Sequence, residues 1–456
     1  AGEEGSGGRA VAHYPDGRRI RSGAITRRAP DARLYRVGLP SAEPTLGQTK
    51  NGDVFYVALQ TNTRVEVTRS RDQGKTWKIV SPKIGTRNAQ LISFDPYVYV
   101  DPWTDRVFTI DLTVACAYLS YTDDHGESWI TNPLACGRPV NDHQTLFAGP
   151  PAQSPTVGYD SIVYYCWNDV GSSSCGKSLD GGVTFHPTGS PAFPGVDPEA
   201  SGQDGAELCG GLHGHGYVGD DGTVFIPKGH CGQPWLSISK DEGRTWTRVQ
   251  VAKIGAEGHE ASVATDKKGN IYYAWVARNR LPYLVYSKND GKTWSKPIMV
   301  GAPGLDEANL PSLDVGGVGK VAIAYMGSEN SPFRPMKEED GEGECTAVNQ
   351  CADGDEYKNT TWNGYMTISA DVFAKKPVLY SGTVNDKKDP VKRGECGPGR
   401  CGTAVYDFID IIIGPKGDVW AAWVDACVSI CATPSGASDM GNDGVVGRLV
   451  GGPNMN

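Results

Sequence analysis

The sequence lacks the features of several common functional classes. It has no cluster of lysine and arginine, and its net charge of −9 gives no support for a nucleic-acid partner. No apolar run approaches the roughly 18 residues that a membrane-spanning helix needs. No Gly-x-Ser-x-Gly elbow precedes a helical pattern, which disfavours a serine-triad hydrolase. We therefore predict a chain with no membrane span and no nucleic-acid partner.

The cysteine spacing typical of zinc sites is also absent, because no Cys-x-x-Cys pair occurs. The twelve cysteines instead fall as near neighbours, which is typical of disulfides in an oxidising compartment, with buried free thiols as the alternative. We expect secretion, and the start AGEEGSGG fits a mature chain whose leader has been removed. The simplest interpretation is six local bridges: Cys116 with Cys136, Cys166 with Cys175, Cys209 with Cys231, Cys345 with Cys351, Cys396 with Cys401, and Cys427 with Cys431.

The composition indicates a folded chain with many turns. Charged residues at 21% and aromatic residues at 9% are ordinary for a globular protein and exclude disorder of the bulk. Glycine (59) and proline (30) are plentiful, yet they form neither a collagen period nor a low-complexity tract. The composition therefore favours an all-β protein.

A repeated octet organises the middle of the chain. SRDQGKTW at Ser70–Trp77 returns as TDDHGESW, SLDGGVTF, SKDEGRTW and SKNDGKTW, with starts 48 to 61 residues apart. This spacing fits a four-stranded antiparallel blade of a β-propeller. In each octet the aspartate, or asparagine in the fifth, suits a hairpin turn, the glycine two residues later permits a positive φ, and the last aromatic residue packs between sheets. The octet is therefore predicted to serve folding.

The octets resemble the Asp-box, or BNR repeat, of a superfamily whose best-known members are the sialidases. The resemblance implies a propeller and an exo-glycosidase that acts on an extracellular glycan. Sialidases share an arginine triad that clamps a substrate carboxylate, and Tyr35–Pro40 (YRVGLP) is similar to the segment that holds the first arginine. The resemblance therefore carries over to Arg36 alone, since no other arginine of the triad is matched.

A second pattern gives the number of blades. Seven times, an apolar strand is followed by a turn and then by another apolar run. The turn GDDG at 219–222 is one example. We predict a seven-bladed propeller of four-stranded antiparallel blades with Asp-box turns, formed as a single domain by residues 1–456. Classical sialidases resemble a six-bladed version, so this count departs from the family. The N-terminal segment (1–40) is expected to supply a strand that closes the last blade, and an acidic insertion (336–358) interrupts the sixth.

Alignment of the seven inner strands gives a polar face. We predict that this face lines the central channel, with Asp142, His259, Asn309 and Asp407 at its mouth. One register position, ionisable in five of seven blades, carries Glu43, Asp95, His143, His213, Glu260, Leu310 and Phe408. Two residues further on, and on the same face because strand side chains alternate, stand Thr45, Tyr97, Thr145, His215, Ser262, Ser312 and Asp410.

These positions supply the candidate site residues. Imidazole, carboxyl and phenol groups are the usual general acids and bases. His213 and His215, together with His143, also form a weak pattern for a metal site. The non-functional interpretation is that the channel is filled with water and its lining is polar for that reason alone. We predict catalytic roles for Arg36, Glu43, Asp95, Tyr97, His143, His215, His259 and Glu260, and substrate-binding roles for Asp142, His213, Asn309 and Asp407.

The expected function is recognition or cleavage of an extracellular polysaccharide by a glycosidase-type site. The alternatives are a non-catalytic propeller that binds glycan or protein or builds an extracellular assembly, and a polysaccharide lyase that abstracts a proton with His or Tyr. No cofactor is expected. Asp353, Asp355 and Glu356 of the insertion offer oxygen ligands for a structural Ca²⁺. The simpler interpretation of the insertion is a solvated charged loop. None of these patterns predicts an oligomeric state.

Overall fold

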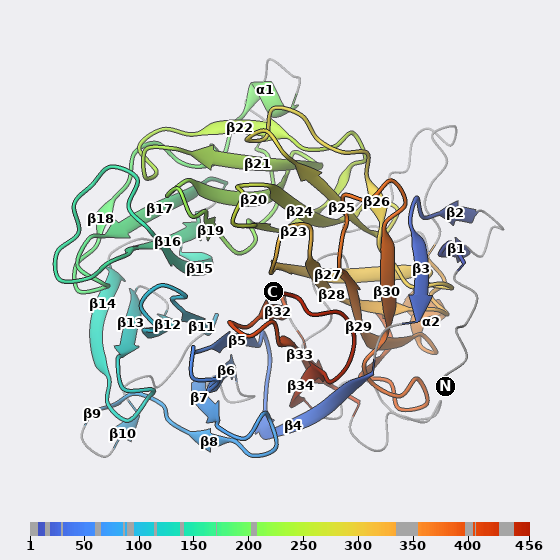
Figure 1. The fold of residues 1–456 in the computed structure, drawn as a ribbon, viewed down its shortest axis with the longest axis horizontal. Coiled ribbons are helices and arrows are strands. Elements are labelled where there is room, and N and C mark those ends of the chain that lie inside the picture. The colour runs from blue at the N-terminus through green and yellow to red at the C-terminus, as the bar shows by residue number, and fades with distance from the viewer. Residues whose placement is uncertain are drawn as a thin grey trace.

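Seven β-sheets surround one axis in the computed structural model, which is a seven-bladed β-propeller (Figure 1). The predicted all-β fold of seven four-stranded antiparallel blades is confirmed. The inner strand of each blade lies nearest the axis, and the blades follow one another around it in chain order. The structure describes residues 8–13, 19–28, 31–59, 65–84, 87–88, 95–113, 116–136, 141–169, 171–201, 208–333, 354–396, 405, 407–427 and 442–456.

Blades 1 to 5 each take four consecutive strands from the chain. Blade 1 holds β5 (Thr45–Gln48), β6 (Val54–Leu59), β7 (Val65–Ser70) and β8 (Lys78–Ile79), and blade 2 holds β11 (Tyr97–Val100), β12 (Val107–Thr113), β13 (Cys116–Thr122) and β14 (Ile130–Cys136). Blade 3 holds β15 (Asp142–Gly149), β16 (Ile162–Asn168), β17 (Ser173–Ser178) and β18 (His186–Pro187). Blade 4 holds β19 (Tyr217–Val218), β20 (Val224–His230), β21 (Gln233–Ser239) and β22 (Thr247–Gln250), and blade 5 holds β23 (Ala256–Thr265), β24 (Ile271–Ala277), β25 (Pro282–Ser287) and β26 (Ile298–Met299).

Blades 6 and 7 each recruit a strand from the N-terminal part of the chain. Blade 6 holds β27 (Glu307–Val315), β28 (Val321–Ser328), β29 (Thr361–Ser369) and β30 (Val378–Thr383), with β3 (Ile25–Arg28) parallel to β30 and β31 (Lys392–Arg393) beside β29. Blade 7 holds β32 (Asp410–Ile413), β33 (Val419–Asp425) and β34 (Asp443–Leu449), and its outermost strand is β4 (Ala32–Pro40), antiparallel to β34. Pairing of an early strand with the last one therefore joins the two ends of the ring.

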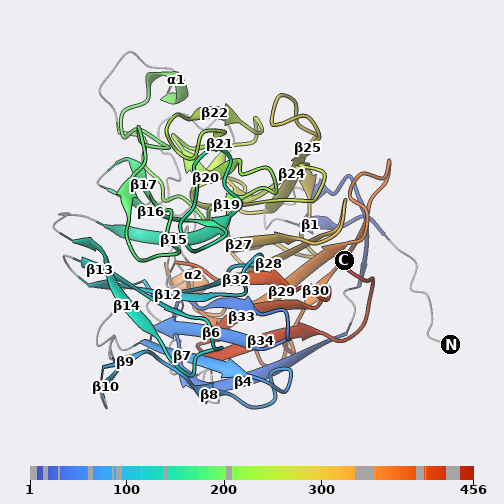
Figure 2. The ribbon, with the colours of Figure 1, turned by 60° about the vertical axis from the view of Figure 1, so that its left-hand side comes forward.

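The remaining elements are short. The strands β1 (Val11–His13) and β2 (Arg19–Arg21) form one hairpin, and β9 (Lys83–Ile84) and β10 (Arg87–Asn88) form another. The helices are α1 (Pro198–Ser201), which lies beyond β22 at the outer edge of blade 4 (Figure 1 and Figure 2), and α2 (Gly354–Tyr357). Within the described ranges, neither the length nor the apolar character of any helix suffices for crossing a membrane.

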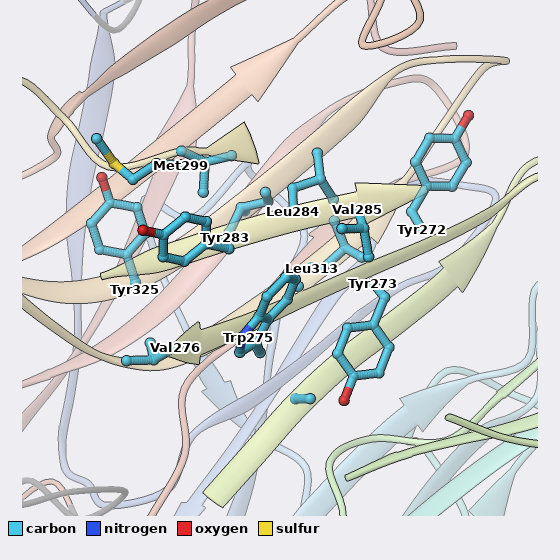
Figure 3. Packing of buried hydrophobic residues seen from close by; sticks show 14 of the residues in the cluster. Tyr272, Tyr273, Trp275, Val276, Tyr283, Leu284, Val285, Met299, Leu313 and Tyr325 are labelled. Atoms are coloured by element: carbon cyan, nitrogen blue, oxygen red, sulfur yellow. The ribbon is translucent and has the colours of Figure 1, made fainter. Parts of the chain in front are cut away.

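The core lies between the blades, because each sheet packs both of its faces on neighbouring sheets. The second strands β6, β24 and β33 are buried along their whole length, and their sequences VFYVAL, IYYAWVA and VWAAWVD are nearly continuous apolar runs. Figure 3 shows this packing in blade 5, where Trp275 and Tyr283 stack with ring centroids 5.6 Å apart and Leu313 of blade 6 lies close by. Burial on both faces explains why these strands lack a simple apolar–polar alternation.

The octets form hairpin turns held by their own side chains. In the first octet, the Thr76 backbone N–H and hydroxyl donate to the two oxygens of Asp72 at 2.8 and 2.6 Å. In the fifth, Asn289 Oδ1 accepts from the backbone N–H of Thr293 at 2.9 Å, so the amide replaces the carboxylate. The glycine has a positive φ in every octet, as expected: Gly74, Gly126, Gly182, Gly243 and Gly291.

Replacing Asp241 with alanine should lower the free energy of unfolding by about 1 to 2 kcal/mol, because the backbone N–H of Thr245 would lose its acceptor at 2.9 Å. Asp241→Asn should cost much less, because Asn289 makes the equivalent bond in the fifth octet. Urea unfolding of both variants measures the difference. Equal losses for alanine and asparagine would contradict the proposed acceptor role.

Two of the six expected disulfides are observed, Cys166 with Cys175 and Cys209 with Cys231. Cys116 and Cys136 are register partners in β13 and β14, and Cys396 and Cys427 are also disulfide-bonded. Cys401 and Cys431, the predicted partners of Cys396 and Cys427, lie outside the described residues. The same holds for Cys345, Cys351 and Asp353 of the insertion. Of the insertion's expected Ca²⁺ ligands, Asp355 and Glu356 fall in α2.

Candidate functional site: the channel cluster

Side chains of the two polar columns meet across the propeller axis. His143 of blade 3 forms an ion pair with Glu260 of blade 5, and His215 of blade 4 has its Nδ1 3.8 Å from Oδ1 of Asp410 in blade 7. Blades that are not neighbours approach each other only at the axis, so these side chains occupy the channel. We call the following residues the channel cluster: Glu43, Asp95, Tyr97, His143, His213, His215, Glu260, Asp407, Phe408 and Asp410.

An irregular backbone directs several of these side chains. Glu43, His143 and Leu310 share one register position in three blades, and their φ angles are 52°, 50° and 53°. The pairing of β15 with β16 and of β27 with β28 shifts register at this point. Left-handed backbone costs about 1 to 3 kcal/mol for residues other than glycine, and bulges re-aim side chains beside functional sites. The repeated bulge therefore marks the start of the inner strands as the specialised end of the channel.

Glu43 and Asp95, from neighbouring blades, are two buried carboxyl groups in different environments. Glu43 Oε1 accepts from the Asp407 backbone N–H at 3.3 Å, whereas Oε2 has no hydrogen-bond partner among the described residues. Burial raises the pKa of Glu43 well above its usual value, and the charges of Asp95 and Asp407 raise it further. Burial raises the pKa of Asp95 to about 6, opposed by the charge of His143, whose backbone N–H also donates to Asp95 at 2.9 Å. Burial thus favours the protonated form of Glu43, whereas Asp95 is mainly ionised near pH 7.

His143 is the cation of the channel cluster. Burial lowers its pKa, but the facing carboxylate of Glu260 and weaker contributions from Asp95 and Asp407 raise it overall to about 9. The side chains of His143 and Glu260 are only 5% and 6% exposed. His143 is therefore protonated at neutral pH and is not available there as a base.

The other two channel histidines are neutral. Burial, together with the charge on His143, lowers the pKa of both His213 and His215 to about 3. The Nε2 atoms of both rings are buried and have no hydrogen-bond partner within the described ranges. The His215 ring meets Tyr97 edge-on, with ring centroids 4.9 Å apart.

Asp410, from the second register column, is a further carboxyl group of the site, and its sequence position predicted no role for it. It accepts backbone N–H bonds from Leu46 at 2.8 Å and Ile411 at 2.9 Å, yet burial raises its pKa to about 8. Its position two residues after the ionisable column was the available signal. Because polar residues fill that whole column, the pattern alone did not distinguish the carboxyl group from the hydroxyls around it.

The structure does not bring every candidate residue to the axis. Arg36 lies on β4, the outermost strand of blade 7, where it pairs with Asp425 at 2.9 Å and Asp443 at 3.1 Å. The outermost strand is the part of a blade farthest from the channel, so Arg36 does not belong to the channel cluster. Asp142 is exposed at the start of β15 and Asn309 is buried in β27. The side chain of His259 lies outside the described residues.

The described residues contain one group with the spacing of a metal site: Cys209, His230 and Cys231. Its two cysteines form a disulfide with each other, which removes them as thiolate ligands. His143, His213 and His215 do not form such a group. The channel geometry therefore adds no support to the hypothesis of a metal held by these three histidines.

No protein-family model matches the chain, and no curated protein matches its sequence. Among solved structures, a protein of unknown function from Dyadobacter fermentans is 13% identical, with a TM-score of 0.43 over 92% of this chain and 99% of its own. The intramolecular trans-sialidase of Ruminococcus gnavus is 14% identical, with a TM-score of 0.42 over 92% and 98%. The α-L-arabinofuranosidase of Fusarium graminearum, solved with arabinobiose, is 12% identical, with a TM-score of 0.40 over 66% and 92%. At these identities and TM-scores, the likeness carries no argument about activity.

Proposed function

We propose that the channel cluster is a glycosidase site for an extracellular polysaccharide, with Glu43 as the general acid and Asp95 as the general base or nucleophile. The single observation behind this proposal is that two buried carboxyl groups from neighbouring blades lie in different environments, which raise the pKa of Glu43 well above its usual value and that of Asp95 to about 6. Glycoside hydrolysis requires such a pair, in which one group protonates the leaving oxygen and the other activates water or attacks the sugar. Oε2 of Glu43, which has no hydrogen-bond partner in the described part of the chain, is the atom that would donate the proton.

The charges of the cluster favour a neutral sugar as substrate. Its carboxyl groups outnumber its single cation, His143, which is already paired with Glu260. A sialoside or a uronate would bring a further negative charge, and the channel cluster, as far as the described residues show it, contains no arginine to receive that charge, since Arg36 lies on an outer strand. Secretion is part of the proposal, and the observed disulfides support it.

The lyase alternative has one specific observation in its favour. A lyase needs a neutral base, and His215 has a low pKa and lies against Tyr97. His143 is protonated and does not meet this requirement. A lyase also needs a group that neutralises the uronate carboxylate, and the acidic channel disfavours it. We therefore rank hydrolysis of a neutral glycan above elimination.

An activity screen on neutral glycans, sialosides and uronate-containing polysaccharides tests the proposal by following reducing ends and unsaturated-product absorbance together. We expect reducing ends from a neutral glycan, their loss in Asp95→Asn, and wild-type activity in Asp220→Asn, an exposed residue at the opposite end of the channel. Unsaturated products that disappear in His215→Ala would identify a lyase instead. Silence on all substrates would favour a binding or structural propeller and would overturn the proposal.

A further inference from the structure

Trp103 differs from every other tryptophan of the chain. All eleven tryptophans lie in described segments, and ten of them pack in the hydrophobic clusters between blades. Trp103 belongs to none of these clusters and remains partly exposed. It lies in the turn between β11 and β12, on the wall of a cavity of about 530 Å³. An indole that is left out of the core beside a cavity is free to contact a ligand.

The cavity opens at the end of the propeller opposite the channel mouth. Its walls come from the β11–β12 turn, from the octet turn between β13 and β14, and from the segment before β16. These segments lie at the end of the propeller where the inner strands finish. The channel cluster lies at the other end, where the inner strands begin. The cavity is therefore separate from the channel cluster.

A buried carboxylate holds the aromatic wall in place. Asp101 accepts from the Trp103 backbone N–H at 2.9 Å, from the Thr104 hydroxyl at 2.9 Å and from the Tyr159 hydroxyl at 2.6 Å. Asp101 is completely buried, so these bonds form behind the cavity surface. The positions of the Trp103 backbone and the Tyr159 ring are thus set before any ligand arrives.

Arg106 completes this rigid wall and has its charge already neutralised. Its guanidinium lies 4.0 Å from the Tyr121 ring centroid and 4.5 Å from that of Tyr159. Two of its nitrogens donate to the two oxygens of Asp123, both at 2.7 Å, and a third donates to the Gly181 carbonyl at 2.8 Å. The guanidinium of Arg106 is therefore occupied by Asp123 and the Gly181 carbonyl, and it provides no free positive charge for an anionic ligand.

Polar groups that keep at least one atom for a ligand surround the aromatic wall. Asp160 is exposed on the rim, and Asp105 uses one carboxylate oxygen to accept from the Lys50 backbone N–H at 2.7 Å. His125 is partly exposed, and because its Nδ1 is buried 3.6 Å from Oδ2 of Asp53, Nε2 is the ring nitrogen that can bond a hydroxyl group. Acidic acceptors beside a flat apolar ring suit a ligand that has an apolar face and a rim of hydroxyl donors.

We propose that this cavity is a second carbohydrate site that binds a neutral sugar unit, with Trp103 stacked on the apolar face of the sugar ring and Asp105, Asp160 and His125 bonded to its hydroxyls. The site requires no catalysis in the channel. It would hold a polysaccharide on the face of the propeller opposite the channel mouth.

The test uses the whole protein and the methyl glycosides of glucose, galactose, arabinose and xylose as probes, with methyl sialoside as the anionic control. Saturation-transfer NMR and tryptophan fluorescence titration report binding. We expect at least one neutral glycoside to bind, sialoside not to bind, and Trp103→Ala to weaken binding about tenfold or more. Absence of binding by all four neutral probes, or equal binding to Trp103→Ala, would overturn the inference.

Two further variants separate this site from the channel and from loss of folding. Glu43→Gln should leave the Trp103-dependent binding unchanged, whatever happens to activity. Trp103→Phe should retain most of the binding because it keeps a flat ring, and Asp160→Asn, an exposed change, should weaken it without a shift in the urea midpoint. If binding disappears only in Glu43→Gln, the sugar occupies the channel and the second site is refuted.

Discussion

Replacing Glu43 with glutamine should lower kcat/KM on an unactivated neutral glycoside by about 10²- to 10⁴-fold. Glutamine keeps the shape of the side chain and an acceptor for the Asp407 backbone N–H, but it has no acidic proton to give to the leaving oxygen. A nitrophenyl glycoside needs little help from an acid, so the same variant should recover most of its activity on that substrate. Asp95→Asn should be equally impaired on both substrates.

The pH dependence follows from the same two groups. Activity should rise as Asp95 ionises, around its pKa of about 6, and should fall at higher pH as Glu43 loses its proton. With the nitrophenyl substrate, Glu43→Gln should lose the falling limb and keep the rising one. A wild-type profile with no rising limb, or full activity of Asp95→Asn, would remove Asp95 from the mechanism.

Replacing Glu260 with leucine should lower the free energy of unfolding by about 3 to 5 kcal/mol, the largest stability effect we expect from a single change. The substitution leaves the imidazolium of His143 buried without its facing carboxylate. Urea unfolding measures the loss. The double variant His143→Phe with Glu260→Leu is the matched control and should recover much of the stability, because it removes both buried charges.

The ion pair also predicts how stability depends on pH. The pKa of His143 is raised to about 9 in the folded protein, against about 6.5 in an unfolded chain. The resulting stability is fully present below about pH 6.5 and is lost as pH rises through about 9, because the folded state then no longer binds the extra proton. Wild-type stability should therefore fall across this window, whereas that of Glu260→Leu should change less. A loss below about 1 kcal/mol in Glu260→Leu, or identical pH curves, would contradict a structural role of the pair.

Local patterns in the sequence predicted the repeating parts of the fold. Each octet contains its own acceptor at Asp72, Asp124, Asp180, Asp241 or Asn289 and its own turn glycine, so neighbouring residues suffice to form the turn. Strand alternation likewise identified the face that carries Glu43, Asp95 and His143, because side chains two residues apart share a face. These features depend on a few consecutive residues, and the number of blades follows from counting them.

Only the tertiary structure decided which of these residues meet and what their protonation is. His143 pairs with Glu260 across the axis, and that encounter depends on closure of the whole ring. Burial then raises the pKa of Glu43 and lowers that of His215, and no composition or spacing reveals burial at one position. Arg36 lies away from the site because β4 is an outer strand, and Trp103 is set apart from ten similar tryptophans by its surroundings alone. The sequence by itself determined the blades and their polar face, whereas contacts between residues distant in the chain determined the chemistry.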